Sequence, residues 1–136
     1  MYRTGNGVPK DYKTALKWYR IAAERGNAGS AFTLGLMYNN GDGVSQDNKE
    51  AEKWFRLAAE QGNISAQFNL GKMYYFGNGV QQDDVYAHMW WNIVASSGDK
   101  DAVTLKDAVS KRMTSSQIEK AQDLARECVH KKYKGC

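Results

Sequence analysis

The sequence predicts an all-α protein, a solenoid of stacked helical hairpins. Three observations predict it: the same residue types return every 36 residues, apolar side chains recur at i, i+3, i+4 and i+7, and the 136 residues contain one proline. Together they favour repeated helix–turn–helix units that share a continuous core with their neighbours.

The repeat becomes visible when the chain is shifted by 36 residues against itself. The shift aligns Gly5-Asn6-Gly7-Val8 with Gly41-Asp42-Gly43-Val44 and with Gly77-Asn78-Gly79-Val80. It also aligns sets of aspartates, alanines, tryptophans and glycines: Asp11, Asp47 and Asp83; Ala15, Ala51 and Ala87; Trp18, Trp54 and Trp90; Gly26, Gly62 and Gly98. So many matches at one period, without a gap, indicate a structural repeat.

The second helix of a unit is predicted from Asp47 to Gly62. Asp47 is a good N-cap with Glu50 as its capping-box partner, and Gly62 suits the left-handed position after the last turn. The helical spacing places five apolar residues on one buried face: Ala51, Trp54, Phe55, Ala58 and Ala59. Equivalent helices are expected at residues 11–25 and 83–97.

The first helix of a unit is expected at residues 28–39 and 64–76, before a Gly-x-Gly-Val turn whose glycines take positive φ. Gly35 and Gly71 fall in the middle of these helices, where glycine costs up to about 1 kcal/mol relative to alanine. We attribute them to close approach of the partner helix. The three repeated tryptophans should dominate stability, because burying one large side chain contributes roughly 1.5–3 kcal/mol.

The two ends of the array differ. Residues 1–112 form about three repeats, the first incomplete, and residues 113–136 form a capping helix and a basic tail, with Thr114 and Gln117 as a capping box. The first unit lacks its partner helix, so we expect an open apolar face there, in a longer array or in self-association. That face comprises Ala15, Trp18, Tyr19 and Ala22.

Charge and cysteine content leave partner and compartment open. Residues 1–99 carry ten Lys/Arg and ten Asp/Glu, whereas residues 100–136 carry nine and five, so the net charge of +4 resides at the C-terminus. Cys128 and Cys136 fit either a small disulfide or two free thiols. With no signal peptide at the N-terminus, the localisation stays unknown, cytoplasmic or periplasmic and secreted.

The chemistry-bearing residues do not form a recognisable catalytic set. His88 and His130 have no neighbouring Cys, Asp or Glu with triad or metal-ligand spacing, and Asp83 of the Asp83-Asp84 pair is in the helix-cap register. The Gly-x-Gly turn lacks the third glycine and the preceding strand of a nucleotide loop. We therefore expect no enzyme activity, no catalytic residue, no metal and no cofactor.

The order Leu-Gly-x-Met-Tyr, Gly-x-Gly-Val, Asp, Ala, Trp, Ala-Ala and Gly resembles the Sel-1-like repeat family, which is related to the tetratricopeptide repeats. The resemblance covers residues 1–98, and the segment from Met113 is similar to the terminal helix of such arrays. It implies a right-handed α-α superhelix that serves as an adaptor in protein complexes, often bacterial and often exported. Trp91, at the position of Phe55, departs from the pattern in a way that suits contact with the cap.

The expected binding surface is the concave face lined by the first helices. Ten residues on the stripe opposite the core are the candidates for peptide binding: Phe32, Leu36, Asn39, Asn40, Phe68, Lys72, Tyr75, Phe76, Lys111 and Arg112. Arg3, Ser65 and Thr104 extend the stripe. Aromatic anchors flanked by cations suit a peptide with apolar and acidic residues. The alternative for Phe32 and Phe68 is simple packing between hairpins.

Three functions remain open from the sequence. The first is a protein–protein interaction scaffold that binds a peptide or protein through the concave face. The second is binding of nucleic acid or an acidic partner through the basic C-terminal segment and Tyr133, although the segment carries no recognised motif. The third is a purely structural spacer in a larger complex.

Overall fold

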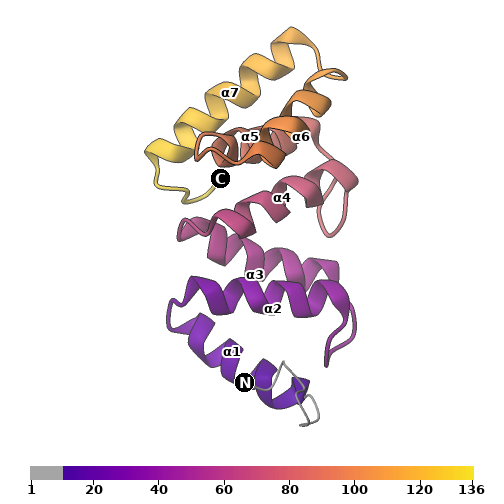
Figure 1. Cartoon of the computed structure of the whole chain (residues 1–136), viewed down its shortest axis with the longest axis vertical. Coiled ribbons are helices and arrows are strands. Elements are labelled where there is room, and N and C mark those ends of the chain that lie inside the picture. Colours follow the sequence, from indigo (N-terminus) through magenta and orange to yellow (C-terminus); the bar gives the residue numbers. More distant parts are fainter. Residues whose placement is uncertain (1–10) are drawn as a thin grey trace.

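The computed structural model describes residues 11–136, which form seven α-helices and contain no strand. In chain order the helices are α1 (Tyr12–Glu24), α2 (Ala28–Asn40), α3 (Asn48–Glu60), α4 (Ile64–Phe76), α5 (Asp84–Ala95), α6 (Lys100–Ser110) and α7 (Ser115–His130). They stack one above another from α1 at one end to α7 at the other (Figure 1). The all-α solenoid predicted from the period is confirmed.

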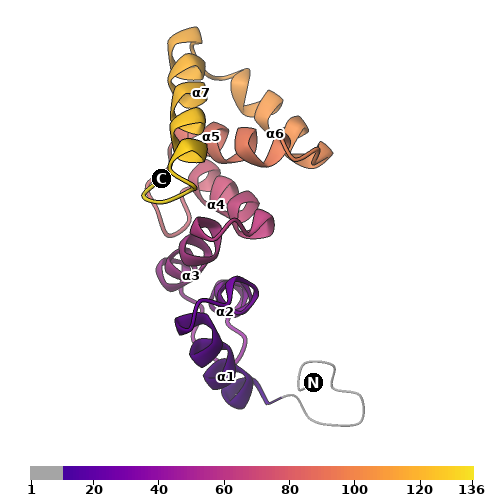
Figure 2. The ribbon, with the colours of Figure 1, turned by 90° about the vertical axis from the view of Figure 1, so that its left-hand side faces the viewer.

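The helices alternate between the two sides of the stack. Helices α2, α4 and α6 are the first helices of their units, and α1, α3 and α5 are the second helices. Figure 2 shows α2 and α6 on one side of the stack and α3 and α7 on the other. Consecutive helices from α1 to α6 pack against each other, and α7 packs on α5. The side formed by the first helices is called the α2–α4–α6 face below.

The second helices and α7 begin at the capping residues that the sequence predicts. Asp47 and Asp83 each accept two backbone N–H bonds in the first turn, of α3 and α5 respectively. The expected capping box at Asp47 is wrong, because the backbone N–H of Asp47 donates to the carbonyl of Tyr38 instead of to Glu50. The box at Thr114 and Gln117 is present in both directions.

The Gly-x-Gly turns have the predicted backbone. Gly41 and Gly43 have φ values of 76° and 75°, and Gly77 and Gly79 have 73° and 77°. Only glycine adopts this left-handed region without strain. The first copy of the turn, residues 5–8, lies outside the described residues.

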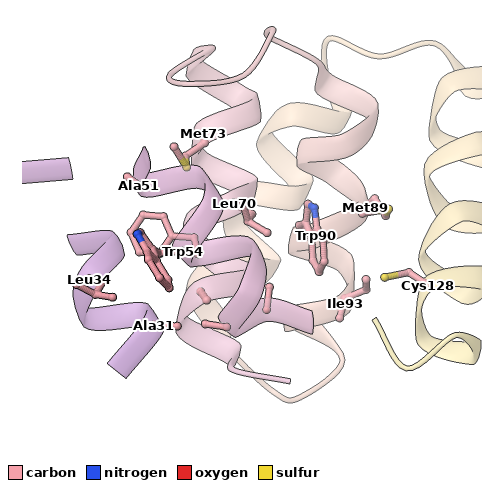
Figure 3. Close-up of a cluster of buried hydrophobic side chains, with 14 of the residues drawn as sticks. Ala31, Leu34, Ala51, Trp54, Leu70, Met73, Met89, Trp90, Ile93 and Cys128 are labelled. Carbon is pink, nitrogen blue, oxygen red and sulfur yellow. The ribbon is translucent and has the colours of Figure 1, made fainter. Parts of the chain in front are cut away.

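The core runs through the centre of the stack as one cluster of buried side chains. Figure 3 shows Trp54 and Trp90 at successive levels of this cluster. Trp54 is 8% exposed and Trp90 is 1% exposed, so both tryptophans are interior residues. The helical stripe predicted for α3 is also confirmed, because all five of its residues are buried.

Gly35 and Gly71 make room for an aromatic ring from the neighbouring helix. A Cβ on Gly35 would lie 2.5 Å from Cδ1 of Phe55, and one on Gly71 would lie 2.6 Å from Cδ1 of Trp91. No side chain fits at these distances, so the expected close approach is confirmed. Trp91 also packs with Val109 of α6 and with Met113, which agrees with the expected contact toward the cap.

The C-terminal segment is fastened to the stack. A disulfide joins Cys128 to Cys136, which decides between the two alternatives left open by the sequence. Tyr133 packs against the core, 3.7 Å from the position of a Cβ on Gly62, and the Gly135 N–H donates to the Glu60 carboxylate at 3.4 Å. The tail therefore reaches back past α5 to the turn between α3 and α4.

We expect the disulfide to contribute to the stability of the whole cap. A Cys136→Ala change should lower the free energy of unfolding by about 2–3 kcal/mol, since the cross-link restricts the unfolded chain and holds the tail in place. Urea unfolding followed by far-UV circular dichroism measures this. Adding reductant should lower the urea midpoint of the native protein to that of the variant and should leave the midpoint of the variant unchanged. If the two proteins had equal midpoints without reductant, the prediction would be wrong.

Helix α1 has the exposed face that was expected, with one correction. Trp18 is 59% exposed, and Tyr19 and Ala22 are half-buried. Ala15 was expected to be exposed, but it is buried, with 5% of its surface exposed. It lies on the face of α1 that packs against the rest of the stack. The expectation that all three repeated tryptophans dominate stability is thus wrong for Trp18, because little of its surface leaves water.

Candidate binding surface

The α2–α4–α6 face contains a hollow of about 220 Å³ that spans three helices. Phe32 of α2 and Phe68 of α4 line it, in equivalent positions of successive repeats. Five more residues complete the lining: Ile64, Ser65, Asn69, Asp99 and Asp101. The two rings also serve the fold, because Phe32 packs on Phe55 at 5.7 Å between ring centroids and Phe68 packs in the cluster around Trp91. The packing interpretation of these phenylalanines is confirmed, and peptide binding by them stays a prediction.

The charge at the rim of this hollow is negative. Asp99 caps α6 by accepting the Ala102 N–H at 2.9 Å, and Asp101 lies exposed in the first turn of the same helix. The expected cations lie farther along the face: Lys72 is one turn beyond Phe68 on α4, about 6 Å along the axis. Two phenylalanines and two aspartates thus line the hollow, and the exposed cation Lys72 lies outside it, one turn beyond Phe68.

A second group of candidate residues forms a stacked cluster. The Tyr75 ring packs against Phe76 at 4.9 Å and against Trp91 at 5.5 Å between centroids. The Arg112 guanidinium lies 4.2 Å from the Tyr75 centroid and donates two hydrogen bonds to Asp84, at 2.9 and 2.7 Å. These bonds raise the pKa of Arg112. Arg112 is therefore engaged within the chain, whereas Phe76 is 63% exposed and available.

The remaining candidates are scattered on the face. Leu36 is half-buried and packs on the core, so its side chain is largely used by the fold. Asn39 and Asn40 are exposed at the end of α2, and Lys111 is exposed at the end of α6. Arg3 lies outside the described residues. The structure therefore brings together Phe32 and Phe68 in one place and Tyr75, Phe76 and Arg112 in another.

Sequence reasoning missed the polar and apolar rim of the hollow: Ile64, Asn69, Asp99 and Asp101. The signal for them was present, because Asp99 occupies the N-cap register of Asn27 and Asn63. First-helix N-termini of adjacent units lie side by side in a solenoid. The predicted binding residues all lie on the helical stripe opposite the core, and this stripe does not include N-cap residues such as Asp99.

A larger hollow of about 430 Å³ lies between α1 and α3, on the opposite side of the stack from the hollow at Phe68. Its three cations all have partners. Arg20 donates to the hydroxyl of Tyr38 at 2.6 Å, Arg56 pairs with Glu52 and donates to Tyr74, and Lys53 pairs with Glu50 at 3.5 Å. Arg20 and Arg56 are one repeat apart, as are the two tyrosines. This arrangement is a repeated link between hairpins.

The two histidines lie in different environments, and neither belongs to a group of potential metal ligands among the described residues. His88 is 2% exposed, and burial lowers its pKa, helped by the charge of Lys106 and opposed by that of Asp107. His130 is exposed in the last turn of α7. Within residues 11–136 no group of three or more His, Cys, Asp or Glu is arranged to hold a metal ion. No helix in that range is long and apolar enough to cross a membrane.

The basic tail has neighbours of its own. Lys131 forms an ion pair with Glu127 at 3.7 Å, and Tyr133 is half-buried against the core. A base-stacking platform requires an open aromatic face. The Tyr133 ring is instead used to fasten the tail.

Comparison with known proteins places the chain among helical repeat proteins. A crystal structure of a protective antigen present in uropathogenic Escherichia coli strains, which displays an SLR fold, aligns with a TM-score of 0.83 and 31% identity. The alignment covers 90% of this chain and 27% of the antigen, so the chain spans about a quarter of its length. A Sel1 repeat protein from Oxalobacter formigenes aligns with a TM-score of 0.71 and 34% identity, over 79% of this chain and 80% of that one. No curated protein sequence matches.

The protein is an α-solenoid whose units are helical hairpins of fixed length. The Sel1 repeat model matches residues 1–27, 28–63 and 64–99, which is most of the chain. The protein belongs to the Sel1 repeat family. Members of this family are generally scaffolds for protein interactions, and the fold is a non-catalytic scaffold fold.

Proposed function

We propose that this protein is an adaptor without catalytic activity that binds a peptide segment of another protein on its α2–α4–α6 face. The hollow between Phe32 and Phe68 carries this proposal, because it presents two aromatic walls and an exposed rim at a junction of three helices. A volume of about 220 Å³ suits one or two apolar side chains rather than a whole small molecule.

The charges near the hollow set the chemistry of the peptide. Asp101 favours a basic residue next to the apolar anchor, and Lys72, one turn beyond Phe68 on α4, favours an acidic residue farther along the peptide. This refines the sequence-based expectation of an apolar and acidic peptide. Phe76, exposed at the end of α4, offers a further apolar contact near the acidic residue.

A panel of fluorescein-labelled peptides of about 12 residues tests the proposal. Each carries a central Phe or Leu, with Lys before it and Glu after it, or with both charges changed to Lys, to Glu or to Ser. We expect the Lys-Phe-Glu peptide to bind with a dissociation constant of about 10–100 µM by fluorescence anisotropy, and the uniformly charged peptides to bind more weakly.

A Ser65→Trp change should reduce this affinity at least about tenfold, because a large side chain on exposed Ser65 fills the hollow without removing a core contact. Ser116→Trp adds the same side chain to an exposed position in the first turn of α7 and should leave binding unchanged. Equal affinities for the two variants, or no binding by any peptide, would show that the hollow is not the binding site.

A further inference from the structure

The exposed face of α1 differs from the equivalent face of every other second helix. Trp18 is 59% exposed, whereas Trp54 and Trp90 in the same register are 8% and 1% exposed. An open hollow of about 530 Å³ surrounds it, lined by Trp18, Ile21, Ala22, Arg25, Gly26 and Asn27. This face has the composition of an internal interface, and within residues 11–136 it has no covering helix.

The interior of the stack shows what such a tryptophan packs against. The guanidinium carbon of Arg20, on α1, lies 5.6 Å from the ring centroid of Trp54, on α3. Tyr38 fixes this arginine through its hydroxyl. An occupant of the α1 face should therefore bring a cation to the Trp18 ring and small apolar side chains to Ile21 and Ala22.

Helix α1 carries this set of groups in a self-complementary order. Trp18 and Arg25 are seven residues apart, about 10.5 Å along one side of the helix, and Ile21 and Ala22 lie between them. When two copies of α1 run antiparallel about a two-fold axis between residues 21 and 22, residue 18 of each faces residue 25 of the other. Every contact then occurs twice.

We propose that α1 binds α1 of a second copy of this chain, with the Trp18 ring of each copy packed under the Arg25 guanidinium of the other. The contact covers Trp18, which is exposed where the equivalent Trp54 and Trp90 are buried. Ala22 near the two-fold axis lets the helices approach closely. One helix face per copy is a small interface, so the dissociation constant should be about 10–100 µM.

Sedimentation velocity on the full chain tests the dimer. The native protein should shift from monomer to dimer between about 1 and 500 µM, and Arg25→Ala should weaken association about tenfold. Trp18→Glu should remain monomeric over this range. Val129→Glu, which charges an exposed apolar residue on α7, should dimerise as the native protein does. A native protein that stays monomeric throughout, or a Trp18→Glu variant that still dimerises, overturns the proposal.

Disulfide cross-linking tests the antiparallel geometry separately. Ala22→Cys lies beside the two-fold axis, so oxidation should link two copies covalently. Lys13→Cys would sit about 25 Å from its equivalent along the helix axes and should not cross-link. A non-reducing gel distinguishes the two variants, and efficient cross-linking of Lys13→Cys with none of Ala22→Cys would overturn the antiparallel contact.

Discussion

Replacing Gly71 by alanine should destabilise the protein by about 2 kcal/mol, although alanine is the better helix former. The intrinsic preference favours alanine by up to about 1 kcal/mol. Against it, the new Cβ would lie 2.6 Å from Cδ1 of Trp91. That ring is held in place, because its Nε1–H donates to the Phe68 carbonyl at 3.2 Å and the ring packs against Tyr75 at 5.5 Å between centroids. Overpacking of this kind costs typically 1–3 kcal/mol or more.

A matched control and a rescue separate packing from helix propensity. Gly29→Ala, in the first turn of α2, places its Cβ at an ordinary 3.4 Å from Asn27 and should be neutral or stabilising. In a Trp91→Leu background, the cost of Gly71→Ala should fall to near zero, since the smaller side chain leaves room. Urea midpoints for the four variants measure these effects. If Gly71→Ala were as stable as the native protein, the close approach of Trp91 would not be the reason for the glycine.

The repeat made most of the fold predictable from the sequence, for a physical reason. Residues that recur at one period must occupy equivalent environments, so Gly35 and Gly71 identify each other as contact points and Asp47 and Asp83 identify helix starts. The period also predicted that α7 is a cap, because the Leu-Gly pattern ends before it, and α7 packs on α5. The missing partner helix of the first unit also predicted the open environment of Trp18, which is 59% exposed, whereas the burial of Ala15 was not predicted.

The candidate surface was less predictable, because it depends on which side chains the fold leaves free. Arg112 follows the stripe in register, yet it binds Asp84, a residue 28 positions away that no helical spacing connects to it. Asp101 contributes to the hollow only because α6 begins beside α4. Such pairings arise from the angle between adjacent hairpins. The sequence pattern identifies which face of each helix is polar, but it does not determine the angle between adjacent hairpins.

The three repeated tryptophans should differ in their contribution to stability in the order of their burial. Trp90→Ala should lower the free energy of unfolding by about 3–5 kcal/mol, because a side chain that is 1% exposed leaves a cavity in the core of the stack. Nε1 of Trp90 has no hydrogen-bond partner among the described residues, so the loss is one of packing. Trp18→Ala should cost about 1 kcal/mol or less, since most of its ring is already in water.

Low protein concentration is essential for this comparison, because association through α1 would stabilise the native protein and make Trp18 seem more important. At about 2 µM the chain should be monomeric, and urea unfolding then reports on a single molecule. Trp90→Phe provides a milder variant that keeps most of the ring volume, in case Trp90→Ala does not fold. Equal losses at positions 18 and 90 would mean that α1 is covered in solution even at this concentration. Burial by a neighbouring hairpin, and not the indole itself, makes the repeated tryptophan stabilising.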